Sequence, residues 1–159
     1  MAVVLGDRSD LGVAVSAYLR APDFLAVLSG ITGIPNLLSD PNFFGGGTHE
    51  NLHGQELDAL VDFNFDPVTK SHRRLNLLVY LNREWREEWG GSIELYSNPR
   101  RPAENRITSF LPIFQSRALF ETNAYSWHGF PIIDLPPDKQ PLSRKSISQL
   151  SLLTRQTKR

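Results

Sequence analysis

The pattern of apolar residues divides the chain into a helical first part and a longer second part with the texture of a β protein. Four apolar residues at helical spacing follow a candidate N-cap at Asp10: Leu11, Val15, Tyr18 and Leu19. Pro22 is expected to open a second helix over Asp23–Leu28. These patterns predict a helical N-terminal part that extends over residues 1–44.

From residue 45 onwards, short apolar runs alternate with turn residues, which is typical of antiparallel β proteins. Short strands of this kind suit a double-sheet jelly roll, with the N-terminal helices packed on one sheet. We therefore predict one domain over 1–159, with a β core at 45–153 and a flexible tail at 154–159. The predicted strands are His49–Gln55, Leu57–Phe63, Arg74–Leu81, Ser92–Tyr96, Ile107–Ile113, Ala118–Glu121, Trp127–Ile132 and Ser146–Leu153.

The composition of the 159-residue chain excludes several classes of function. Basic and acidic side chains balance at 17 each, so no overall field attracts the chain to nucleic acid or to an anionic membrane. The absence of cysteine excludes disulfides, thiolate metal sites and cysteine nucleophiles, so any metal must be held by nitrogen and oxygen. No signal-peptide pattern opens the chain, and no apolar run approaches the ~20 residues of a membrane span. We therefore expect a soluble, cytoplasmic protein.

Several segments occur in an order that resembles the central part of a known enzyme family. They are DFN at 62–64, RRLNLLVYLN at 73–82, Trp85, GGSIEL at 90–95, SWHG at 126–129 and RKS at 144–146. The order resembles that of prolyl 4-hydroxylase-like oxygenases that depend on 2-oxoglutarate and Fe(II), over roughly residues 45–153. The resemblance implies a double-stranded β-helix, the cupin-like form of the jelly roll.

The resemblance implies a metal site made by a His-x-Asp pair and a distant histidine. Non-haem iron of this kind is held by two histidines and one carboxylate, which leaves positions open for co-substrate and dioxygen. Residues two apart on a strand share a face, so the pair can reach one ion. The aligned triplet here is Leu60-Val61-Asp62, in which leucine replaces the first histidine. Asp62 and His128 are therefore the candidate catalytic residues and metal ligands.

Other residues are weaker candidates for the third ligand. Asp58 shares the strand face of Leu60 and Asp62 by the period-two rule, but it lies ~13 Å from Asp62 along the strand. His49 and His53 belong to an earlier strand, and an isolated histidine is more often hydrogen-bonded or exposed than a ligand. His72 is expected in a solvated loop.

The resemblance also assigns the co-substrate pocket. The far carboxylate of 2-oxoglutarate needs a buried cationic partner, and the planar fork of a guanidinium fits a carboxylate with two hydrogen bonds. The resemblance gives this role to Arg144, with help from the hydroxyl of Tyr80 and a further hydrogen bond from Ser146. Without the resemblance, Arg144 could be a surface ion-pair residue and Tyr80 a packing residue.

Three functions follow as hypotheses. The first is a dioxygenase that uses Fe(II) and 2-oxoglutarate to hydroxylate an unidentified small-molecule or peptide substrate. The second is a catalytically impaired or non-catalytic barrel that binds a small carboxylate or a partner protein, because Leu60 replaces the histidine. The third is an iron site with two protein ligands that water completes. The sequence identifies neither the substrate nor the oligomeric state.

Overall fold

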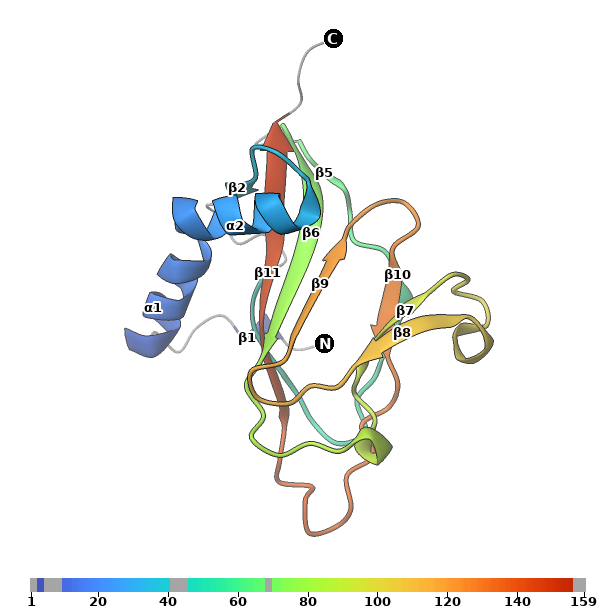
Figure 1. The fold of residues 1–159 in the computed structure, drawn as a ribbon. Helices are drawn as coiled ribbons and strands as arrows, with labels where there is room; N and C mark the ends of the chain where they lie inside the picture. Colours follow the sequence, from blue (N-terminus) through green and yellow to red (C-terminus); the bar gives the residue numbers. More distant parts are fainter. Residues whose placement is uncertain (1–2, 5–9, 41–45, 68–69, 156–159) are drawn as a thin grey trace.

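The computed structural model describes residues 3–4, 10–40, 46–67 and 70–155, which form two antiparallel sheets with two helices beside them (Figure 1). The larger sheet has seven strands, with the order β1-β3-β11-β6-β5 and with β2 and β9 paired to β11 and β6. Its strands are β1 (Val3–Val4), β2 (Leu38–Ser39), β3 (Gly47–Asn51), β5 (Phe65–Asp66), β6 (Ser71–Tyr80), β9 (Arg117–Glu121) and β11 (Arg144–Arg155). The smaller sheet has four, in the order β4-β10-β7-β8. These are β4 (Leu57–Leu60), β7 (Ile93–Tyr96), β8 (Arg106–Phe110) and β10 (Trp127–Phe130).

The main hydrophobic core lies between the two sheets. Tyr80 and Phe120 contribute from the larger sheet, and Ile93 and Phe130 contribute from the smaller one. Connections close the core, among them the short 3₁₀ helix η1 (Glu87–Trp89). Trp89 of this helix meets Trp85, which precedes it, edge to face. A second 3₁₀ helix, η2 (Pro102–Glu104), lies in the β7–β8 connection. This arrangement confirms the predicted double-stranded β-helix.

Two N-terminal helices, α1 (Asp10–Leu19) and α2 (Pro22–Thr32), lie on the larger sheet's other side (Figure 1). Leu28 of α2 packs with Leu75 of β6 in a second core that is separate from the one between the sheets. Because an apolar sheet face needs a cover, these contacts explain why α2 packs on this side of the larger sheet. No helix in the described part of the chain is long and apolar enough to span a membrane.

The helix boundaries differ in part from those predicted. Asp10 is the first residue of α1, so its prediction as an N-cap is wrong. Pro22 opens α2 as predicted, since its fixed φ suits the first turn, but the helix continues to Thr32. It ends where Gly33 takes a left-handed conformation with φ of 70°. The N-terminal part is also not wholly helical, because β1 and β2 lie within it.

Each predicted strand corresponds to an observed one, with shifted ends. The prediction for His72 is wrong, because it lies within β6 and its ring contacts that of Phe65 in β5. His72 lies in a strand because β6 pairs with β5 at this position. The polar residues around His72 in the sequence did not indicate this pairing. The predicted tail is too long, since β11 continues through Arg155; residues 156–159 lie outside the described part.

The pairing of β4 with β10 contains an irregularity that matters for the site. Leu60 lies opposite His128 and Leu57 opposite Phe130, so three steps on β4 correspond to two on β10. Backbone approach is close here, because a Cβ on Gly129 would lie 2.4 Å from the carbonyl oxygen of Leu57. Only glycine at position 129 permits this bulged register.

We expect Gly129→Ala to lower the free energy of unfolding by about 1–3 kcal/mol, because the backbone strands must separate to admit the methyl group. The matched control is Gly30→Ala in α2, where an added Cβ meets no atom within 4 Å. This control should stabilise the protein by ~0.5–1 kcal/mol, because alanine favours the helix. Urea unfolding of the three proteins measures both effects, and equal effects of the two substitutions would contradict the close approach at Gly129.

Candidate functional site

A cavity of about 110 Å³ opens between the two sheets. Its polar wall comes mainly from the larger sheet, through β3, β6 and β11, while β4, β7 and β10 supply most of its apolar wall. The lining residues are His49, Asn51, Leu57, Leu60, Asp62, Asn76, Leu78, Ile93, His128, Phe130, Arg144, Ser146 and Ser148.

Strand alternation places the polar residues of β11 on the cavity face. Arg144, Ser146 and Ser148 are each buried, while Lys145 between them is exposed. The neighbouring strands are in register with them. Ser146 pairs with His49 of β3 on one side and with Tyr80 of β6 on the other. The result is a polar patch inside a barrel whose remaining interior is apolar.

Arg144 is a buried cation held by neutral groups. Its Nε donates to the carbonyl oxygen of Gly91 (2.6 Å), Nη1 to Asn51 Oδ1 (3.2 Å) and Nη2 to the hydroxyl oxygen of Tyr80 (3.2 Å). The guanidinium carbon also lies 4.4 Å from the ring centroid of Phe130. In the described part of the chain no carboxylate forms an ion pair with it. Burial accordingly lowers the pKa of Arg144.

Gly91 holds the guanidinium from the smaller sheet's side. Its φ is +70°, a left-handed conformation that side chains rarely adopt. A Cβ there would lie 2.9 Å from Ile133 Cγ1 and 3.3 Å from Arg144 Cδ. The glycine therefore lets the backbone carbonyl approach the stem of Arg144 closely enough to accept its Nε–H.

Tyr80 contacts the guanidinium of Arg144 and is not among the residues that line the cavity. The ring is fully buried, and its oxygen accepts the hydrogen bond from Arg144. Burial raises the pKa of Tyr80 to about 12, although the neighbouring Arg144 opposes this shift. The phenol therefore keeps its proton at neutral pH and supports Arg144 as a neutral hydrogen-bond acceptor.

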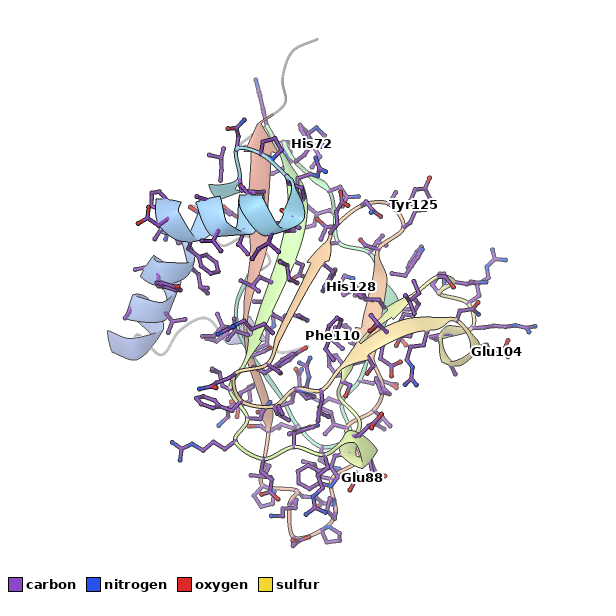
Figure 2. The ribbon with its side chains drawn as sticks, in the orientation of Figure 1. His72, Glu88, Glu104, Phe110, Tyr125 and His128 are labelled. Atoms are coloured by element: carbon purple, nitrogen blue, oxygen red, sulfur yellow. The ribbon has the colours of Figure 1, made fainter. Side chains whose placement is uncertain are left out.

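Asp62 and His128 come together as the sequence predicts. Their Oδ2 and Nε2 atoms lie 3.7 Å apart, although 66 residues separate them in sequence. Ser126's carbonyl accepts a hydrogen bond from His128 Nδ1 at 2.9 Å, which orients the ring so that Nε2 lies on the side of Asp62. The ring lies between the two sheets, against Phe120 (Figure 2).

The donor set does not complete the predicted metal site. Two ligand atoms that bind one ion at ~2.1 Å lie roughly 3–4 Å from each other. The 3.7 Å between Asp62 Oδ2 and His128 Nε2 agrees with this distance, so these two residues could share an ion. Leu60 pairs with His128 across the strands and lines the cavity, so an alkyl group lies where a third donor is needed. Among the described residues no group of three metal-binding side chains could hold an ion. The residues present therefore do not fit iron held by a two-histidine, one-carboxylate set.

The weaker candidates do not supply the third donor. Asp58 is exposed, because the bulge in β4 turns Leu57 and Leu60 to the cavity and breaks the period-two rule. His53 is also exposed, and its Nδ1 accepts the backbone N–H of Leu135 (3.0 Å). His49 lines the cavity but is not grouped with Asp62 and His128 as a metal site.

Three polar residues of the cavity were not assigned a role from the sequence. Asn76 donates from Nδ2 to Asp62 Oδ2 at 3.3 Å and orients that carboxylate. Asn51 accepts from Arg144, and Ser148 lines the wall. Strand alternation could have found each of them, since Asn76 shares a face with Tyr80, Ser148 shares one with Arg144, and Asn51 shares one with His49.

Comparisons with known proteins agree with this architecture. The sequence model of the 2OG-Fe(II) oxygenase superfamily matches residues 46–149. Among solved structures, a prolyl 4-hydroxylase from Phytophthora capsici superposes with a TM-score of 0.53 at 18% sequence identity. The match covers 84% of this chain and 40% of the other, so this chain spans less than half the length of that protein. A comparison with curated proteins gives no match.

We expect Leu60→His to raise the affinity for ferrous iron by about tenfold or more, because it places a third donor beside Asp62 and His128. Removing a residue that hydrogen-bonds to a metal ligand lowers metal affinity tenfold or more. Adding a residue that binds the metal directly should change the affinity at least as much. Anaerobic equilibrium dialysis followed by metal analysis measures the change.

The matched control is Val61→His, which adds the same side chain one residue further along, where the native residue does not line the cavity. The control should bind iron as the wild type does. Equal affinity in Leu60→His and the wild type would contradict the alignment of Leu60 with the missing ligand.

Proposed function

Because this chain belongs to the 2OG-Fe(II) oxygenase superfamily, we propose that it binds 2-oxoglutarate, or a dicarboxylate of similar size, in the cavity between its sheets. The observation that carries the proposal is Arg144, a buried cation with neutral partners on the cavity wall. A buried charge without a counter-charge is costly, and a ligand carboxylate would offset that cost.

The cavity wall supports an acid rather than a neutral ligand. Three N–H groups of Arg144 are used within the protein, which leaves two of its five to face a ligand. Ser146 lines the same wall, and its Oγ is buried with no hydrogen-bond partner in the described part of the chain. A carboxylate only accepts hydrogen bonds, so it suits this set of donors.

These residues can bind and orient an acid without a metal. Arg144 supplies charge, and its contacts to Gly91, Asn51 and Tyr80 hold its fork in one direction before a ligand arrives. Because the fork is already ordered, little side-chain entropy is lost on binding. The apolar wall formed by Leu57, Ile93 and Phe130 excludes water and strengthens each charged hydrogen bond.

A second candidate is the iron-dependent dioxygenase activity itself, with an unidentified substrate. The observation that favours it is the approach of Asp62 to His128, with Asn76 and Ser126 orienting the two side chains. Asp62 and His128 would be the protein ligands of the iron, which would supply the chemistry of dioxygen activation with 2-oxoglutarate as co-substrate. Leu60 weighs against it, so we place it second, with a catalytically impaired acid-binding barrel first.

We expect Arg144→Met to weaken 2-oxoglutarate binding by about a hundredfold, since it removes two charge-assisted hydrogen bonds of ~1.5 kcal/mol each. Methionine keeps much of the buried stem's volume. The matched control is Lys145→Met on the exposed face of the same strand, which should leave affinity unchanged. Calorimetric titration of 2-oxoglutarate into each protein, with chelator present, measures the affinities.

The same titration with ferrous iron under anaerobic conditions separates the two candidates. Binding that is independent of iron, together with no succinate release in air, supports the acid-binding barrel. Binding that requires iron, with succinate released in air, supports the dioxygenase. No heat in any combination contradicts both.

A further inference from the structure

One buried nitrogen of the cavity has no role in the site described so far. His49 lies on β3, and its Nε2 atom is buried with no hydrogen-bond partner among the described residues. The side chain lines the same cavity as Arg144 and Ser146. A polar atom taken from water without a partner costs roughly 1–3 kcal/mol, so such an atom in a cavity wall points to a ligand.

The strand register fixes where this nitrogen lies. His49 pairs directly with Ser146 of β11, and Asn51, two residues further along β3, pairs with Arg144. Residues opposite each other on antiparallel strands have Cβ atoms ~5 Å apart, and the neighbouring pair on the same face is ~7 Å along. The imidazole is thus next to the serine hydroxyl and one step from the guanidinium.

We infer that His49 is a further recognition residue of the cavity, which donates a hydrogen bond from Nε2 to the ligand carboxylate that Arg144 attracts. Ser146, whose Oγ is also buried and unpartnered among the described residues, pairs with His49 and lies two positions from Arg144, so it would be the third donor of the set. The inference rests on the proposed function, and it adds a residue for which the resemblance to the oxygenases gave no role.

The electrostatics of the cavity keep the ring neutral. Burial lowers the pKa of His49, and the nearby positive charge of Arg144 lowers it further. A neutral imidazole carries one N–H and one lone pair, so it can donate to a carboxylate without adding a second buried cation. The positive charge of the ligand site therefore comes from Arg144, while the hydrogen bond from His49 orients the ligand carboxylate.

A purely structural role would require contacts that the structure does not show. No hydrogen bond or ion pair joins His49 to another side chain in the described part of the chain, and its ring is not part of the hydrophobic core between the sheets. Its removal should therefore cost the free protein little. Loss of an unpartnered buried nitrogen can even stabilise the fold, as expected of a residue kept for binding.

Two substitutions of His49 and one control test the inference. His49→Leu keeps the volume and removes both nitrogens, while His49→Gln keeps an amide donor near the position of Nε2. Glu50→Gln is the matched control, since Glu50 is the next residue on β3, exposed and bonded to Ser143 on the outside. For each protein we would measure the affinity for 2-oxoglutarate by calorimetry, and the thermal midpoint with and without it.

We expect His49→Leu to weaken 2-oxoglutarate binding at least tenfold, with His49→Gln within about threefold of the wild type and Glu50→Gln unchanged. The ligand-free midpoint of His49→Leu should equal or exceed that of the wild type, while its rise on ligand addition is lost. Unchanged affinity in His49→Leu would overturn the role of His49 alone. A lower ligand-free midpoint with unchanged affinity would show a structural residue instead, and a wild type that binds no 2-oxoglutarate would overturn the proposed function as well.

Discussion

The guanidinium of Arg144 is the group around which the inside of this barrel is arranged. It begins the longest strand, β11, and its hydrogen bonds reach β3, β6 and the turn before β7, so one side chain ties the larger sheet to the smaller. Removing such a charge from water is expensive, and its partners within the protein are neutral. The left-handed Gly91, the buried phenol of Tyr80 and the amide of Asn51 all serve to hold it.

This arrangement favours binding over stability. A barrel selected for stability alone would fill its centre with apolar side chains, since these pack without needing partners. Here, His49, Asn76 and Ser146 present buried polar atoms that no described residue satisfies, and all three line the cavity that contains Arg144. Thr122 Oγ1 is a further such atom that does not line the cavity. The three on the cavity wall lie where a ligand could supply the missing partners.

The two ends of the site differ in how many of the residues implied by the resemblance they contain. At the Arg144 end, Arg144 and Tyr80 are in contact, while Ser146 lines the cavity with a hydroxyl that no described residue satisfies. At the other end, Asp62 and His128 meet and are oriented by Asn76 and Ser126, yet Leu60 removes one donor. Co-substrate recognition and metal binding are physically separable, because the first depends on a protein cation and the second on a set of lone pairs. A member of the oxygenase superfamily can therefore keep one while the other weakens.

The sequence by itself determined the two-sheet architecture, the covering helices and the candidates Asp62, His128, Tyr80 and Arg144, because strand alternation and turn residues are local signals and the motif order is specific. Tertiary structure decided what depends on non-local register. The bulge between β4 and β10 turned Asp58 outwards and brought Leu60 opposite His128, and pairing with β5 drew His72 into a strand. Register also set His49 beside Ser146. Such outcomes depend on which strands lie next to each other and on close backbone approaches such as that at Gly129, which no local pattern of residues encodes.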